Sequence, residues 1–161
     1  HFHQTFKNAA TPFDESMYVE YKKQCDTYFH NHHRGEARGI GGVFFDYLKG
    51  DEKHPSDFWF EFTKNNGNSF IESYVPIVEK RKHLSFTEKQ KYWQEIRRGR
   101  YVEFNLIHDK GTLFGLKTNG RIESILMSLP ATVRWDYNFT PEPNSEEECL
   151  LQVLKHPKDW V

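Results

Sequence analysis

Cysteine is scarce in this sequence, since Cys25 and Cys149 are the only two among 161 residues. Two cysteines do not make a disulfide framework in a chain of this size, so a reducing compartment is favoured. No CxxC pair of the zinc-binding kind is present, and no apolar run approaches the roughly 20 residues of a membrane-spanning helix. The chain begins at His1 without an initiator Met, a signal peptide or a transit-like segment, so we expect it to be a fragment.

An excess of charge of one sign is also lacking. The 22 Lys and Arg residues nearly balance the 23 Asp and Glu residues. This balance argues against a nucleic-acid binder or a polybasic membrane-surface protein. Aromatic residues are abundant instead, with 14 Phe and 8 Tyr, so a core can be built from rings. The length is enough for one hydrophobic core and short for two, which predicts a single domain.

Several catalytic motifs are absent, among them the P-loop and the nucleophile elbow. Glycines at positions 39, 41 and 42 give a GxGG run that precedes a strand-like segment. A dinucleotide-binding loop follows its strand, so the context excludes that interpretation.

The apolar spacing predicts a mixed architecture of helices and strands. Helices are expected at 15–31, from 56 to about 78 with an interruption at 65–68 and a kink at Pro76, at 87–98 with Gly99 at the end, and at 145–154. Strands are expected at 39–48, 101–106, 112–116 and 133–137. Glu103 lies in one of these apolar strands, where we expect it to pair with an arginine. The strands pair locally without regular βαβ alternation, so we expect an α+β fold with a largely antiparallel sheet flanked by helices on both faces.

Residues 32–48, with the sequence HHRGEARGIGGVFFDYL, combine basic side chains with glycines. Arg34 and Arg38 carry planar forks suited to carboxylates. Gly41 and Gly42 allow a sharp turn or a close approach of the backbone to another group. The pattern predicts an anion site at a bend. Residue types alone favour the alternative, a helix that ends in basic residues and exits through glycine.

Asn119, Gly120 and Arg121 form a second candidate anion site, a tight turn with free N–H groups and a guanidinium. In isolation, an Asn-Gly pair is more simply a good hairpin turn. The nine histidines include the pairs His1/His3 and His32/His33, which resemble metal ligands. A closed metal site needs three or four converging groups, and histidines at a helix end are more often solvated.

The segment HRGEARGIGGVFFD closely resembles the signature of the oxygen-dependent coproporphyrinogen III oxidase family. Three further segments resemble the same family in the same order: YVEFNLIHDKGTLFGLKTNGR, ESILMSLPATVRW and KDWV. The resemblance implies that residues 1–161 are the C-terminal portion of a single oxidase domain whose N-terminal half is missing here.

The resemblance implies oxidative decarboxylation of coproporphyrinogen III to protoporphyrinogen IX in haem biosynthesis. O2 would be the acceptor, CO2 and H2O2 would be released, and no organic cofactor would be needed. The family's substrate-contacting turn matches Asn119, Gly120 and Arg121, with Asn in place of a small first residue, and we add Arg34 and Arg38 to the substrate-binding set. The proposed catalytic acid and base would lie before His1, so no catalytic residue is assigned, and we expect the fragment alone to be inactive.

The resemblance also implies a divalent ion held by histidines matching His3 and His33, and a homodimer whose contact lies near 101–136. We expect no nucleic-acid partner, no transmembrane segment and a cytoplasmic location, with the mitochondrial intermembrane space as the alternative. The competing function is a non-enzymatic anion-binding or dimerising α+β module that shares the same basic turns.

Overall fold

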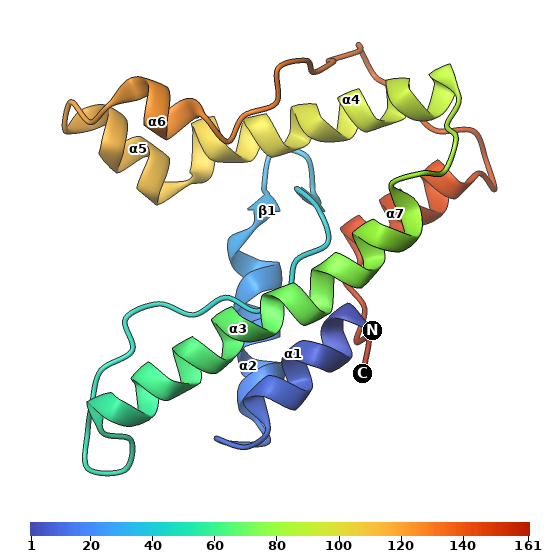
Figure 1. Cartoon of the computed structure of the whole chain (residues 1–161). Coiled ribbons are helices and arrows are strands. Elements are labelled where there is room, and N and C mark those ends of the chain that lie inside the picture. Colours follow the sequence, from blue (N-terminus) through green and yellow to red (C-terminus); the bar gives the residue numbers. More distant parts are fainter. The chain divides into compact units, whose positions relative to one another are not determined.

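The structure is a computed structural model that describes residues 1–161 and divides them into two compact units. Unit 1 consists of His1–Tyr28, Gly41–Ser85 and Lys158–Val161. Unit 2 consists of Phe29–Ile40 and Phe86–Pro157. Helices dominate both units (Figure 1). None of the helices is both long enough and apolar enough to cross a membrane.

Unit 1 contains three helices, α1 (Phe2–Ala10), α2 (Met17–Tyr28) and α3 (Ser56–Arg81). Helix α1 packs against both of the others, and Figure 1 shows it alongside α3. The buried core of this unit consists of Phe6, Ala10, Met17, Tyr18, Tyr21 and Phe62. Rings surround the fully buried Phe62, with those of Tyr21 and Phe45 centred 5.5 Å and 5.1 Å away. The expectation of a core built from rings is therefore correct.

Helix α3 runs through two features that we expected to interrupt or kink it, the polar run at 65–68 and Pro76. Its buried residues Phe62, Asn66, Ser69 and Ser73 recur at three- and four-residue spacing, which places them on one face. The Asn66 Nδ2 donates to the Phe62 carbonyl at 2.9 Å within the helix, whereas its buried Oδ1 has no hydrogen-bond partner. Burial of this face outweighs the local preference for a break.

Unit 2 begins with a short antiparallel hairpin, β1 (His30–Asn31) and β2 (Glu36–Ala37), in which His30 lies opposite Ala37. The other elements are α4 (Glu88–Glu103), the π-helix η1 (Phe104–His108), α5 (Lys110–Lys117), α6 (Ile122–Leu126) and α7 (Glu146–Lys155). In Figure 1, α4 leads through η1 into α5 and α6.

Side-chain caps set the starts of α4 and α7 in unit 2. The Thr87 hydroxyl accepts from the Gln90 N–H, and the Gln90 side chain accepts from the Thr87 N–H, which completes a capping box at the start of α4. The Ser145 hydroxyl accepts from the Glu148 N–H at the start of α7. Both starts agree with the prediction from sequence.

The expected largely antiparallel sheet is not observed. The two-residue strands β1 and β2 form the sheet, and the chain is mostly helical, so only the coarser expectation of mixed helices and strands holds. Residues 101–106 and 112–116, expected as a hairpin, instead lie in the end of α4, in η1 and in α5. Residues 133–137 belong to no strand, although the Arg134 N–H donates to the Glu95 carbonyl at 3.2 Å.

Packing explains why residues 101–104 form a helix rather than the expected strand. The buried residues Ile96, Gly99, Arg100, Glu103 and Phe104 occupy positions i, i+3, i+4, i+7 and i+8, which form one face of a continuous helix. A helix satisfies its own backbone groups, whereas a strand needs a neighbouring strand. Gly99 therefore does not end the helix as we expected.

Residues 39–48 were expected to form a buried strand, but they belong to no ladder. The Phe44 N–H donates to the Tyr21 carbonyl at 3.0 Å, which fixes this segment on α2. A Cβ atom added to Gly41 would lie 2.5 Å from Cys25 Sγ, and one on Gly42 would lie 3.1 Å from the Phe2 ring. These two glycines therefore serve close approach rather than a turn.

Candidate anion-binding site

The turn between β1 and β2 carries His33 and Arg34. It requires Gly35, whose φ is +65°, a conformation that side chains other than glycine rarely adopt. The buried Asn31 donates from Nδ2 to the Arg100 carbonyl at 2.9 Å, so the hairpin is tied to the last turns of α4. The turn thus meets the buried face of α4 within unit 2.

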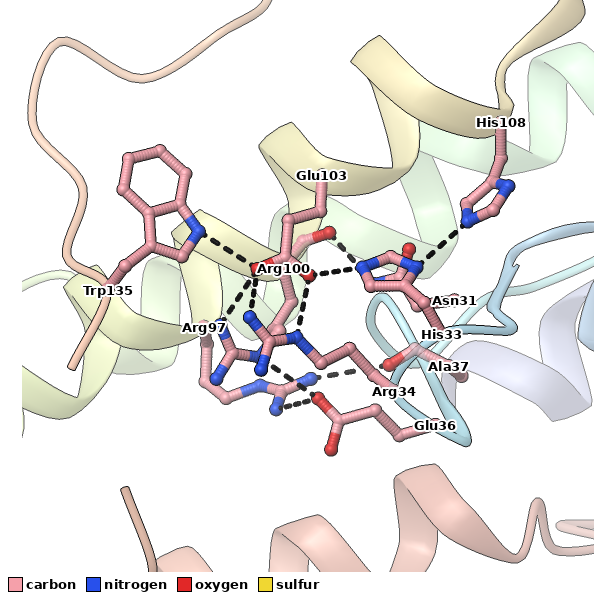
Figure 2. A network of polar contacts seen from close by, with 10 residues as sticks. All are labelled: Asn31, His33, Arg34, Glu36, Ala37, Arg97, Arg100, Glu103, His108 and Trp135. Carbon is pink, nitrogen blue, oxygen red and sulfur yellow. Dashed lines mark hydrogen bonds and ion pairs between the residues drawn. The ribbon is translucent and has the colours of Figure 1, made fainter. Parts of the chain in front are cut away.

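The Glu103 carboxylate on α4 contacts His33 and Arg34 of this turn. We call the surrounding set the Glu103 network, and Figure 2 shows it: His33, Arg34, Glu36, Arg97, Arg100, Glu103, His108 and Trp135. Arg34 donates to Glu103 along one edge, from Nε to Oε2 at 3.0 Å and from Nη2 to Oε1 at 2.8 Å. This is the two-point geometry by which arginine recognises a carboxylate.

Three more side chains contact the same carboxylate. Arg100 Nη1 and Trp135 Nε1 donate to Oε1 at 3.1 Å and 2.9 Å, and His33 Nε2 lies 2.8 Å from Oε2. Glu103 is 8% exposed, so its charge is compensated by these donors more than by water.

Glu36 on β2 provides the second carboxylate of the network. Its Oε1 accepts from Arg97 Nη1 at 2.6 Å and lies 3.4 Å from Arg100 Nε. The network therefore holds three guanidinium groups and two carboxylates, which leaves an excess of one positive charge. Such an excess favours an added anion.

Electrostatics keep Glu103 ionised. Burial alone would raise the pKa of Glu103, but the hydrogen bonds from Arg34 and His33 and the charge of Arg100 lower this pKa to about 2. The hydrogen bond to Glu103 also raises the pKa of Arg34. Burial lowers the pKa of Arg100 from its usual high value.

Arg38 follows β2 and lies among aromatic rings. Its Cζ is 4.1 Å from the ring centre of Phe29, 4.9 Å from that of Tyr101 and 4.7 Å from that of Phe104. Its Nη1 donates to Asn105 Oδ1 at 3.4 Å. Cation–π contacts of this kind fix the orientation of a guanidinium.

The two histidines predicted as metal ligands lie in different units. In unit 1, His3 Nδ1 is 3.0 Å from the Tyr18 hydroxyl, and its buried Nε2 has no hydrogen-bond partner. In unit 2, both ring nitrogens of His33 are engaged, one by Glu103 and the other by His108 Nε2 at 3.0 Å. An unpartnered Nε2 suits a metal ligand, whereas His33 would have to give up a hydrogen bond. No group of three His, Cys, Asp or Glu side chains in the chain is placed to hold a metal ion.

The second predicted turn, at Asn119, Gly120 and Arg121, joins α5 to α6. Asn119 has a φ of +56°, and the Gly120 N–H donates to the Gly115 carbonyl at 2.9 Å, which closes the end of α5. The Arg121 guanidinium makes no ion pair or side-chain hydrogen bond with the rest of the chain. In Figure 1 this turn lies at the end of α5 away from β1, so the structure does not bring it together with Arg34 and Arg38.

A cavity of about 230 Å³ lies elsewhere, beside the start of α4, between residues 89–93 and 139–147. None of the residues predicted from sequence to bind substrate or metal lines it. The candidate site is therefore the partly exposed Arg34 with the buried charges around it, rather than this cavity.

Sequence reasoning recovered part of the network. The prediction that Glu103 pairs with an arginine is confirmed. Glu36, Arg97, Arg100 and Trp135 were missed as members of the site. The signal for Arg97 and Arg100 was their three-residue spacing from each other and from Glu103, which puts them near one face only if the helix continues past Gly99.

Residues 1–160 match a protein-family model described as coproporphyrinogen III oxidase. The chain is 52% identical over 161 residues to the oxygen-dependent coproporphyrinogen-III oxidase, chloroplastic, of Glycine max, covering 100% of this chain and 41% of that protein. It is 54% identical over 162 residues to the mitochondrial enzyme of Rattus norvegicus, covering 36% of that protein, and 52% identical to that of Homo sapiens, covering 35%. The chain thus spans about two fifths of the length of these curated relatives.

Proposed function

Because this chain belongs to the coproporphyrinogen III oxidase family, we propose that the complete protein containing it converts coproporphyrinogen III to protoporphyrinogen IX with O2. The observation that carries the proposal is the match over residues 1–160, together with identities of 52–54% to curated oxidases. In each step one propionate loses CO2 and two hydrogens and becomes a vinyl group. One O2 takes up the two electrons and two protons and becomes H2O2.

The proposed task of the protein follows from the chemistry of the substrate. A porphyrinogen is electron-rich, so it can react with O2 once the reacting propionate is held and shielded from water. Arg34 and Arg38 would bind propionate carboxylates, supported by the excess positive charge of the Glu103 network and by the aromatic rings around Arg38. No step is assigned to an acid or base in this chain.

Asn119, Gly120 and Arg121 are proposed to contact a second propionate through backbone N–H groups and the Arg121 guanidinium. The support is the absence of any competing partner for that guanidinium. An Arg121→Ala variant of the complete protein should bind coproporphyrin III more weakly in isothermal titration. An unchanged affinity would remove Arg121 from the site.

A divalent metal on His3 and His33 stays a prediction, supported by the buried and unpartnered His3 Nε2 and opposed by the two bonds of His33. Elemental analysis of the purified complete protein, with and without a His3→Ala substitution, tests it. The absence of an organic cofactor is likewise a prediction, and the absorption spectrum of the protein checks it.

We propose a homodimer whose interface includes part of 101–136. Large apolar side chains in this range are exposed, including Phe114 at 69%, Ile122 at 57% and Met127 at 78%, and such exposure is typical of an interaction surface. Light scattering of the complete protein at micromolar concentration tests the proposal, and a monomer would refute it.

The cytoplasmic location expected from the sequence has no support among the relatives named above, which are chloroplastic or mitochondrial enzymes. We propose an organellar location, to be tested by cell fractionation.

The deciding experiment supplies coproporphyrinogen III to the complete protein and separates the products by chromatography, with air in one sample and nitrogen in the other. Protoporphyrinogen IX should accumulate only in air and only with enzyme. A protein that binds coproporphyrin III but forms no vinyl product would instead be the non-enzymatic anion-binding module, which the family match does not favour.

A further inference from the structure

We propose that Glu103 is a positioning residue: it grips one edge of the Arg34 guanidinium so that the opposite edge faces a substrate carboxylate. The inference rests on the proposed function and deepens it, because it assigns to a buried acid the task of aiming a substrate-binding arginine.

The N–H donors of Arg34 are numerous enough to bind Glu103 and a substrate carboxylate at the same time. A guanidinium has five N–H donors in one plane. Glu103 takes the Nε proton and one Nη2 proton, at 3.0 Å and 2.8 Å. The other Nη2 proton and both Nη1 protons remain, and no described hydrogen bond uses them. Because the group is planar, these three protons point away from Glu103, in a geometry that suits a second carboxylate.

The side chains of Arg34 and Glu103 differ in their exposure to solvent. The Arg34 side chain is 40% exposed, whereas that of Glu103 is 9% exposed. The arginine is thus fixed along its inner edge and open to solvent along its outer edge. A negatively charged ligand can reach it without breaking the pair.

Glu103 is itself held in place. Trp135 and Arg100 donate to Oε1, and His33 contacts Oε2, so the carboxylate has little freedom to rotate. A rigid carboxylate in turn limits the rotamers of Arg34. Because Arg34 is ordered before the ligand binds, binding loses less side-chain entropy and is tighter. A loosely held arginine would still attract a propionate, but more weakly.

The local charge favours an anion over a cation at the open edge. The network carries one more guanidinium than carboxylate, and Arg38 follows on the same hairpin. The expected ligand is therefore a carboxylate group, and under the proposed function it is a propionate of coproporphyrinogen III.

The first test uses Glu103→Gln in the complete protein. The amide keeps the shape, but it has one acceptor oxygen and cannot accept from both Nε and Nη2 of Arg34 as the carboxylate does. We expect KM for coproporphyrinogen III to rise about three- to tenfold, in line with the cost of ordering one long side chain, with kcat changed less than twofold. Glu142→Gln is the matched control, since it breaks an exposed ion pair with Lys89 and should leave KM unchanged.

The second test is a double-mutant cycle with Arg34→Ala. If Glu103 acts through Arg34, then Glu103→Gln raises KM in the wild-type background but not in the Arg34→Ala background. A merely structural role would change KM by the same factor in both. An equal factor, or no change in the single variant, would overturn the inference.

A third variant covers the case in which Glu103→Gln fails to fold. Arg34→Lys keeps the charge at an exposed position, but an ammonium lacks a second planar edge. KM should rise as in Glu103→Gln, and an unchanged KM would refute the proposed geometry. The dissociation constant of coproporphyrin III, measured by fluorescence for every variant, tests the inference even if the folded wild-type protein forms no product, an outcome that would refute the proposed function alone.

Discussion

The indole N–H of Trp135 donates to Glu103 Oε1 at 2.9 Å and thereby joins residues 32 positions apart in the chain. Trp135 lies in a segment without regular structure, and its neighbour Arg134 donates its backbone N–H to the Glu95 carbonyl. These two hydrogen bonds hold the segment against α4. The segment lies so close to α4 that a side chain on the helix at this point would clash with it, and the residue there is Gly99.

Gly99→Ala should lower the free energy of unfolding by about 1–3 kcal/mol through overpacking. The added Cβ would lie 2.8 Å from the Arg134 carbonyl oxygen and 3.3 Å from Trp135 Nε1, so a backbone segment has to move. Urea unfolding of the purified protein measures the change. Gly67→Ala on α3 is the control, since nothing lies within 4 Å of its Cβ, and it should stabilise by about 0.5–1 kcal/mol. Equal effects of the two variants would contradict the packing described here.

Glu103→Ala should cost about 3–5 kcal/mol of unfolding free energy, because it leaves buried guanidinium groups without their counter-charge. Arg100 is 8% exposed and depends on Glu103 and Glu36 for compensation. Chemical denaturation at neutral pH measures the loss. A change below about 1 kcal/mol would show that water replaces the carboxylate.

The stability contributed by Glu103 should depend on pH in the acid range. Its pKa is about 2 in the folded protein and 4.5 in the unfolded reference, so the folded state favours the carboxylate. A lowered pKa contributes stability that is fully present above about pH 5 and is lost as the pH falls toward 2, roughly 3 kcal/mol in total. Unfolding free energies of the wild-type protein and Glu103→Gln should therefore converge between these values. A constant difference across this range would be inconsistent with the lowered pKa.

Phe62→Ala should destabilise unit 1 by about 3–5 kcal/mol, since this side chain is fully buried among aromatic rings. Phe60→Ala, two residues away on the same helix, should cost less than about 1 kcal/mol because Phe60 is 65% exposed. Thermal unfolding of both variants provides the comparison. Similar losses would mean that Phe60 is covered in the complete protein.

Local signals predicted the local features of this chain well. The cap at Thr87 and the cap at Ser145 each begin a helix, because the hydroxyl satisfies an N–H group two or three residues away. The arginines at 34 and 38 were identified from their place near glycines, and the structure puts both on one hairpin in unit 2. The turn at 119–121 was also predicted, although it joins two helices rather than two strands.

Predictions that depended on distant partners were less successful. Residues 101–106 alternate as a strand does, yet the same residues also continue the buried stripe of α4, and sequence alone does not decide between periods of two and 3.6. The burial of Ile96, Arg100 and Phe104 on one side decides for the helix. The partners of Glu103 come from β1–β2, from α4 and from the coil at 135, which no single window of sequence connects.

The sequence by itself determined the family, the starts of α4 and α7 and the presence of basic turns, because each depends on neighbouring residues or on the wording of a signature. Only the tertiary structure decided that Glu103 accepts hydrogen bonds from both Arg34 and Arg100. It also decided that the basic turns at 32–38 and 119–121 lie apart in unit 2. The physical reason is that burial and ion pairing depend on which side chains meet across the fold, and the order of residues along the chain leaves that choice open.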